Sequence, residues 1–155
     1  MEKDMDITFE NATYKDIDKI FELNKNLIEK YETNPSLDFK RILAWVRDKI
    51  ENNINSYQCI YFKGIKVGYY YLHNEDENLE LDDFYIFDEF QGRGIGTKIL
   101  SYVKSVAEQE NKEVFLYVFA KNQGAINLYL RNGYKVIENI RDTRYVMSTS
   151  FKNLA

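Results

Sequence analysis

The chain carries the stretch Gln91-Gly92-Arg93-Gly94-Ile95-Gly96-Thr97 between an apolar, strand-like segment and an amphipathic, helix-like segment. At the start of a helix, backbone N–H groups point outward and the helix dipole favours negative charge. Glycine has no Cβ, so its backbone approaches a ligand closely, and glycines at alternate positions allow consecutive amides to surround a pyrophosphate. The stretch therefore predicts a site for a phosphate-bearing ligand.

Two common nucleotide motifs do not fit this stretch. A P-loop ends in Gly-Lys-Ser/Thr, whereas Gly96-Thr97-Lys98 reverses the last two residues. The dinucleotide fingerprint needs G-x-G-x-x-G, and the spacing here is G-x-G-x-G. The alternative without a ligand is a tight turn, because glycine-rich turns are common.

Alternating and helical patterns extend outward from the stretch in both directions. Before it, the sequence predicts strand, capping-box, helix, helix and hairpin segments, with Ser36 as cap of the second helix. An acidic turn follows the first hairpin, and further strands and helices come after it, with glycines between them. The last two strands form a second hairpin. The predicted order is β-α-α-β-β-β-α-β-α-β-β, over Ile7–Phe9, 17–31, 36–50, 57–62, 66–72, 79–87, 95–106, 113–119, 122–132, 134–140 and 143–150.

Length and composition restrict the class of protein. The 155 residues predict a single domain over 1–155, and 45% hydrophobic residues suffice for a core. The net charge of −4 disfavours nucleic-acid binding. One cysteine forbids an intrachain disulfide, and one histidine with it excludes a zinc site built from those residues alone. No leader or membrane-spanning stretch is found, so we expect a cytoplasmic protein.

Two motifs in register resemble a known family. Gln91-x-x-Gly94-x-Gly96 resembles the acyl-coenzyme A pyrophosphate motif of the GNAT superfamily of N-acetyltransferases, and Asn122-x-x-Ala125-x-x-Leu128-Tyr129-x-x-x-Gly133-Tyr134 is similar to its second signature. The segment 81–86, with the glycine stretch, looks particularly like spermidine/spermine N-acetyltransferases. The resemblance implies an α/β (α+β) GNAT-like acyl-CoA N-acyltransferase fold, whose mixed sheet of about seven strands carries helices on both faces. It also implies acetyl-CoA as co-substrate, without a metal.

The resemblance implies positions for the coenzyme. The backbone at 84–86 is expected to splay from its neighbouring strand and to hold pantetheine and the acetyl oxygen. Asn122 resembles an asparagine that contacts coenzyme A, and its alternative role is that of a helix N-cap. The predicted coenzyme-binding residues are Phe84, Tyr85, Ile86, Gln91, Gly92, Arg93, Gly94, Ile95, Gly96, Thr97 and Asn122.

Acetyl transfer to an amine needs a base, a polarised carbonyl and a proton for the thiolate. Tyr129 falls where the family places its general acid, although its ring could also pack in the core. Asp82 matches a proposed base glutamate, and Glu80 shares its strand face by period two, whereas Asp83 points the other way. The alternatives are solvation at a strand end or binding of a cationic substrate.

Other reactive residues are weaker candidates for a catalytic role. Cys59 is expected to be a buried structural cysteine rather than an acyl-accepting nucleophile. His73 at a strand end is more often a surface or packed histidine than a base. The acidic run at 75–77 is expected to be a solvated turn.

The sequence thus predicts an N-acetyltransferase that moves acetyl from acetyl-CoA to a primary amine of a small, cationic acceptor in a ternary complex. The alternatives are a non-catalytic acyl-CoA-binding module with the same fold and a protein N-terminal or lysine amine as acceptor. We expect neither nucleic acid nor membrane as a partner. A homodimer is a further hypothesis, in which Tyr145 and Phe151 pair across the interface; the alternative is that both belong to the core.

Overall fold

The computed structural model describes residues 6–149 and has the element order that the sequence predicts. Phe151 and Ser150, the predicted end of the last strand, lie outside the described residues. The helices are α1 (Ile17–Tyr31), α2 (Phe39–Asn53), α3 (Ile95–Gln109) and α4 (Gln123–Arg131), with 3-10 turns η2 (Tyr14–Asp16), η3 (Ile54–Ser56) and η4 (Asp88–Phe90). The strands are β1 (Ile7–Asn11), β2 (Gln58–Phe62), β3 (Ile65–Glu75), β4 (Asn78–Ile86), β5 (Val114–Phe119), β6 (Lys135–Ile140) and β7 (Arg144–Ser148).

The strands form one mixed sheet with the order β1-β2-β3-β4-β5-β7-β6. Its recorded pairs are antiparallel except for β4 with β5, which are parallel. This arrangement confirms the predicted α/β fold with a mixed sheet of seven strands. By its internal contacts the chain divides into two units, and β3 and β4 each contribute to both. Unit 1 holds residues 6–71 with Asp83–Phe87, and unit 2 holds Leu72–Asp82 with residues 88–149.

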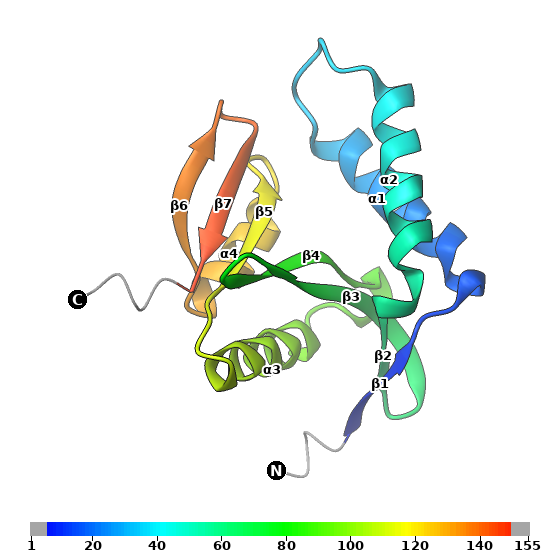
Figure 1. The fold of residues 1–155 in the computed structure, drawn as a ribbon, viewed down its shortest axis with the longest axis vertical. Coiled ribbons are helices and arrows are strands. Elements are labelled where there is room, and N and C mark those ends of the chain that lie inside the picture. Colours follow the sequence, from blue (N-terminus) through cyan, green and yellow to red (C-terminus); the bar gives the residue numbers. More distant parts are fainter. Residues whose placement is uncertain (1–5, 150–155) are drawn as a thin grey trace. The chain divides into compact units, whose positions relative to one another are not determined.

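Unit 1 begins with the predicted capping box. The Asp16 carboxylate accepts a hydrogen bond from the Thr13 N–H, and the box precedes the turn η2, from which α1 continues. Helices α1 and α2 lie side by side (Figure 1). The predicted cap of α2 is wrong: Asp38, not Ser36, accepts from the Arg41 N–H, because Ser36 instead bonds the side chain of Asn34.

The hairpin of β2 and β3 has a tighter turn and a longer second strand than predicted. Lys63 and Gly64 both have positive φ, at 51° and 81°, as the two-residue hairpin turn requires. Strand β3 continues to Glu75, so the acidic turn that follows is confined to Asp76 and Glu77. The acidic run predicted as a turn at 75–77 thus contributes Glu75 to the strand, and His73 lies within a strand rather than at its end.

Unit 2 contains the glycine stretch and both helices of the predicted motifs. Strand β5 pairs with β7, which pairs with β6 in a hairpin (Figure 1). Helix α3 contacts β5. Each unit has a fully buried apolar core, formed by Ile20, Ile50, Ile60 and Val67 in unit 1 and by Ile99, Val103, Val114, Leu116 and Met147 in unit 2.

The prediction that Cys59 is buried is confirmed here. Cys59 is buried, with 2% of its surface exposed, and burial raises the pKa of its thiol to about 11, so the sulfur is held as an inert thiol. Within residues 6–149, none of the helices combines the length and the apolar character that crossing a bilayer requires.

Candidate active site

The glycine stretch forms an open turn at the head of α3. Gly92 and Gly94 have φ of 78° and 82°, a region that L side chains rarely adopt. A Cβ built on either glycine meets no atom within 4 Å, so the space beside the backbone is open to a ligand. Gly94 is the N-cap of α3, and because it has no side chain, no side-chain cap closes the helix.

The backbone N–H groups from Gly94 to Thr97 have no acceptor among residues 6–149. By contrast, the side chains of Asp38 and Asn122 cap α2 and α4. Uncapped N–H groups together with the helix dipole attract an anion. The turn therefore has the donors and the space that a diphosphate needs, and the predicted site for a phosphate-bearing ligand fits this backbone.

Side chains around the turn hold it in place. The backbone N–H of Gln91 donates to the Asp88 carbonyl at 3.2 Å, and the Arg93 guanidinium lies over the Phe90 ring at 5.5 Å. On the other side of the turn, Asn132 Nδ2 donates to Thr97 Oγ1 at 3.4 Å, which links the start of α3 to the end of α4.

Strand β4 separates its acidic residues onto two faces, as predicted. Asp83 is 5% exposed, and in unit 1 its Oδ2 accepts from the Tyr57 hydroxyl at 2.5 Å and pairs with Lys49 Nζ at 3.2 Å. The side chains of Glu80 and Asp82, in unit 2, are 15% and 21% exposed. Asp83 is thus fixed by internal partners, whereas Glu80 and Asp82 face a more open environment.

Strand β4 leaves its neighbour early within unit 2. It pairs with β5 at Leu79 with Val114 and at Glu80 with Phe115. In the described part of unit 2 no further residue of β4 pairs with β5, although β5 continues to Phe119 in its pairing with β7. Parallel strands that part in this way leave backbone groups available for other contacts.

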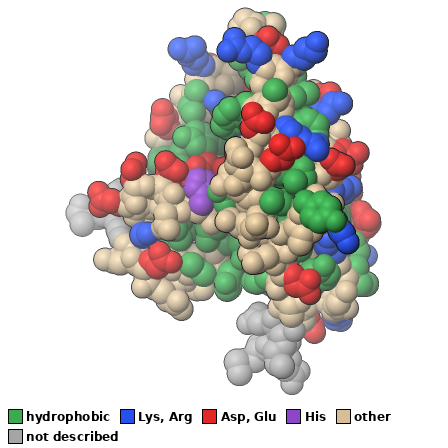
Figure 2. All heavy atoms as spheres, turned by 45° about the vertical axis from the view of Figure 1, so that its right-hand side comes forward, with side chains coloured by type: hydrophobic (Ala, Val, Ile, Leu, Met, Phe, Trp, Pro, Cys, Tyr) green, Lys and Arg blue, Asp and Glu red, His purple; other side chains and the backbone are tan. Residues whose placement is uncertain are grey.

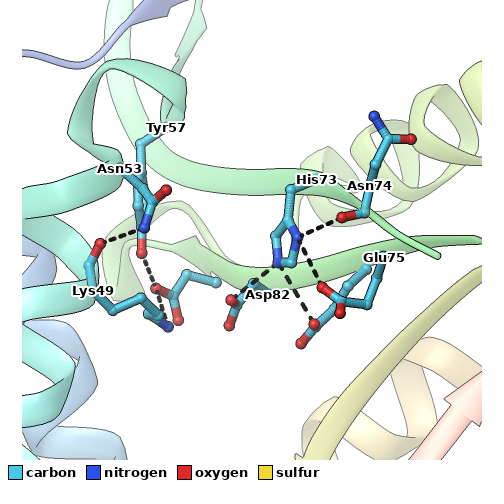
Figure 3. A network of polar contacts seen from close by, with 9 residues as sticks. Lys49, Asn53, Tyr57, His73, Asn74, Glu75 and Asp82 are labelled. Atoms are coloured by element: carbon cyan, nitrogen blue, oxygen red, sulfur yellow. Dashed lines mark hydrogen bonds and ion pairs between the residues drawn. The ribbon is translucent and has the colours of Figure 1, made fainter.

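His73 joins Glu80 and Asp82, which the sequence did not predict. Its Nε2 lies 3.3 Å from Asp82 Oδ2 and 3.5 Å from Glu80 Oε1, and Glu75 Oε2 lies 3.6 Å from Nδ1 (Figure 3). We call these four residues the His73 cluster. The imidazole lies at the surface beside acidic side chains (Figure 2). The alternation of residues along β3 could have predicted this contact. With a short turn between the two strands, His73 lies on the same side of the sheet as Glu80 and Asp82 of β4.

Tyr129 lies on the inward face of α4 and is 9% exposed. Its ring packs against that of Tyr134, with centroids 5.8 Å apart. The hydroxyl has no hydrogen-bond partner among residues 6–149, and burial raises the pKa of the phenol, which keeps it protonated. The ring therefore packs in the core, and the role of the hydroxyl as general acid stays a prediction. Asn122 has the predicted capping role, accepting from the Ala125 N–H at 3.2 Å.

A comparison with protein families shows which family the chain belongs to. The model of the "Acetyltransferase (GNAT) family" matches residues 17–134, which is most of the chain and includes both motifs. The chain belongs to this family. The resemblance found in the sequence is thereby confirmed.

Relatives and structures agree with the GNAT assignment. The chain is 33% identical over 86 residues to the spermine/spermidine N(1)-acetyltransferase of Bacillus subtilis, covering 49% of this chain and 57% of that protein. The chain thus spans little more than half the length of this relative. The fold resembles the PaiA N-acetyltransferase of Thermoplasma acidophilum, solved with coenzyme A (TM-score 0.69, 19% identity, 94% and 99% of the two chains). It also resembles Arabidopsis thaliana Naa50, solved with the bisubstrate analogue CoA-Ac-MVNAL (TM-score 0.60, 21% identity, 94% and 99%).

Two parts of the predicted GNAT site stay predictions. The backbone at 84–86 lies in unit 1, where the Phe87 N–H donates to the Val67 carbonyl and the Tyr85 carbonyl abuts Gly68 so closely that a Cβ there would collide. Its contact with the acyl group is untested. The expected absence of a metal is also untested, since His73, Glu75 and Glu80 offer ligand atoms within 4.8 Å of one another.

Proposed function

We propose that this chain is an acetyl-CoA-dependent N-acetyltransferase that acetylates a primary amine of a small, cationic acceptor by direct transfer in a ternary complex. The observation that carries the proposal is the row of unpartnered N–H groups from Gly94 to Thr97 at the head of α3, in a member of the GNAT family. The similar proteins support it, since they include a spermine/spermidine N(1)-acetyltransferase and an N-acetyltransferase solved with coenzyme A.

Each proposed role follows from the chemistry of a group in this chain. The thioester supplies an activated acetyl group, and the amides of the glycine turn hold its diphosphate. The backbone at 84–86 orients the acyl oxygen. Asp82 or Glu80 takes a proton from the acceptor ammonium, and the protonated phenol of Tyr129 donates to the departing sulfur.

The proposal of a cationic acceptor is based on the negative charge of the carboxylates in unit 2. Glu75, Glu80 and Asp82 put three carboxylates around one imidazole in unit 2, and such a group attracts ammonium ions. An acceptor on a protein is the alternative, and the Naa50 complex with a peptide-bearing analogue belongs to the same fold. We further propose that residues 1–155 act as one domain in the cytoplasm.

Coenzyme binding is tested by thermal unfolding with acetyl-CoA. A ligand at 100 times its Kd adds about 2.7 kcal/mol of stability. Gly94→Ala should abolish most of this shift, because its Cβ enters the open space at the turn and strains the backbone. Gly64→Ala is the matched control: its φ is 81° and its surroundings are equally open, so it carries the same strain without touching the turn.

The outcomes separate the possibilities. A shift in the wild type and in Gly64→Ala but not in Gly94→Ala supports the diphosphate site. No shift in the wild type refutes the proposed function. Equal shifts in all proteins place the coenzyme elsewhere.

The acceptor is tested by thiol release from acetyl-CoA with spermidine, spermine, thialysine and a peptide with a free N-terminus. Release with the small amines supports the proposal. Release with the peptide alone replaces the small amine by a protein acceptor. Coenzyme binding without release from any amine assigns the chain to the non-catalytic alternative.

A further inference from the structure

The end of α4 brings together two tyrosines of the second signature. Gly133 follows the helix with a φ of 88°, and its N–H donates to the Leu130 carbonyl at 3.3 Å. The next N–H, that of Tyr134, donates to the Tyr129 carbonyl at 3.1 Å. These two bonds form a Schellman motif, in which the residue after the glycine commonly packs against the last turn of the helix. The rings of Tyr134 and Tyr129 pack in this way, with centroids 5.8 Å apart and planes at 53°.

The two phenols differ in their access to the surface. Tyr134 is 1% exposed, and its buried hydroxyl has no hydrogen-bond partner among residues 6–149. Tyr129 is 9% exposed, so it is the member of the pair that a substrate can reach. A buried hydroxyl without a partner destabilises the fold, and a phenylalanine ring has the same shape without that cost. Packing alone therefore does not account for the oxygen of Tyr134.

The chemistry proposed for Tyr129 needs a partner of this kind. Burial raises the pKa of the Tyr129 phenol, which keeps its proton in place but makes the proton harder to give to sulfur. A hydrogen bond donated to the phenol oxygen stabilises the negative charge that develops there, and so makes the proton easier to release. Burial also raises the pKa of Tyr134, and the Tyr129 phenol raises it further, so a charge on one oxygen is felt at the other. Tyr134 thus keeps its own hydrogen and can donate it.

We propose that Tyr134 is a positioning residue that donates a hydrogen bond to the Tyr129 phenol oxygen while Tyr129 protonates the departing sulfur; the inference rests on the proposed function. No bond joins the two hydroxyls in the structure, and catalytic hydrogen bonds often tighten only when substrate is bound. As the C–N bond forms, the C–S bond breaks and its electron pair goes to sulfur, which takes the Tyr129 proton. The nitrogen loses one proton as the amide forms, and that proton restores Tyr129. Tyr134 keeps its proton throughout.

The kinetic test is a double-mutant cycle of Tyr134→Phe and Tyr129→Phe, with thiol release measured at saturating acetyl-CoA and spermidine. Tyr134→Phe alone should lower kcat about tenfold, the size of one hydrogen bond to a charged oxygen, and should leave the KM for acetyl-CoA unchanged. In the Tyr129→Phe background it should change kcat by less than about twofold, because the oxygen on which it acts is gone. Two residues that act independently would instead give losses that multiply.

The matched control is Tyr117→Phe, which removes the hydroxyl of a 46% exposed tyrosine on β5 in the same unit. It should keep the kcat of its background, with and without Tyr129. Thermal unfolding of each variant, with and without acetyl-CoA, shows that it is folded and binds the coenzyme. A wild-type kcat in Tyr134→Phe would overturn the inference. An equal loss in both backgrounds would also overturn it, because Tyr134 would then act through the fold.

Two outcomes separate this inference from the proposed function. Full turnover in Tyr129→Phe would remove the acid that Tyr134 is inferred to assist, and the inference would fail while the acetyltransferase function stands. A wild type that releases thiol with none of the amines would remove both.

A crystal structure with coenzyme A gives a readout without turnover. The Tyr134 hydroxyl oxygen should lie within about 3 Å of the Tyr129 hydroxyl oxygen, with Tyr129 facing the sulfur. A Tyr134 hydroxyl that bonds a buried water or the coenzyme instead would overturn the inference. A coenzyme sulfur far from Tyr129 would exclude the acid role of Tyr129 and, with it, the assisting role of Tyr134.

Discussion

Tyr57 and Tyr69 in unit 1 and Tyr129 and Tyr134 in unit 2 are all buried, but the surroundings of their hydroxyls differ. In unit 1, Tyr57 donates to Asp83 at 2.5 Å and Tyr69 donates to Asp16 at 2.8 Å. In unit 2, neither Tyr129 nor Tyr134 has a hydrogen-bond partner for its hydroxyl among residues 6–149. Buried hydroxyls normally find a partner, so the Tyr134 hydroxyl marks a place where the described part of the protein does not complete the bonding.

Carboxylates of the two units also differ in how tightly they are bonded. Asp16 in unit 1 is 8% exposed and receives bonds of 2.7–2.9 Å from Lys66, Tyr69 and the Thr13 N–H. The oxygens of the His73 cluster in unit 2 lie 3.3–3.6 Å from ring nitrogens, on side chains that are 15–52% exposed. The contacts of Asp16 are shorter and more buried than those of the His73 cluster. The polar groups of unit 1 compared here are thus held by short bonds inside the fold, whereas those of the His73 cluster lie closer to the surface.

The largest expected effect is that of Tyr129→Phe on turnover. Loss of the hydroxyl removes the proposed proton donor to sulfur, so kcat should fall about a hundredfold or more. The ring is kept, so acetyl-CoA should still raise the melting temperature as in the wild type. The measurement pairs initial rates of thiol release with thermal unfolding. An unchanged kcat would show that Tyr129 is only a core residue and that its hydroxyl has no catalytic role.

Tyr69→Phe should instead lower stability. It removes a hydrogen bond to a buried carboxylate, and bonds of this kind contribute about 1.5–3 kcal/mol. Urea unfolding at pH 7 should show a loss of this size without a change in the m-value, while thiol release in native buffer stays at the wild-type rate. Tyr57→Phe is the matched variant, since its hydroxyl donates to Asp83 in the same way. A loss of turnover in either variant at unchanged stability would contradict the division of roles.

A smaller effect is expected in acid. Burial tends to raise the pKa of Asp16, but hydrogen bonds from Lys66, the Thr13 N–H and Tyr69 outweigh it and lower the pKa below 3.8. A lowered folded-state pKa gives stability that is complete above the unfolded pKa and is lost as pH falls through the folded value. The stability difference between the wild type and Tyr69→Phe should therefore be constant from pH 7 to 5 and should shrink below about pH 4. A difference that widens in acid would show that Asp16 is not ionised at pH 7.

Sequence patterns predicted the elements well because each has a local cause. The apolar spacing of 17–31, the Thr13 and Asp16 box and the glycines before α3 act within a few residues. The cap of α2 was missed because Ser36 and Asp38 are both good caps, and only the bond of Ser36 to Asn34 decides between them. His73 was missed because its neighbours on β4 depend on where the turn ends, and the acidic run did not show that Glu75 still belongs to the strand.

The smallest expected effect is that of Tyr134→Phe on stability. The Tyr134 side chain is 1% exposed, burial raises the pKa of its phenol, and its hydroxyl lacks a partner among residues 6–149. Leaving a buried donor unsatisfied costs about 1–3 kcal/mol, so removing it should be neutral or stabilise the fold by up to about 1 kcal/mol. For a chain of this size that gain is roughly 2–4 °C in melting temperature. Tyr129→Phe is the matched control, because the two rings pack against each other and any loss of that packing affects both variants. A fall in stability specific to Tyr134→Phe would show that this hydroxyl holds a buried water, and Tyr134 would then resemble the satisfied tyrosines of unit 1.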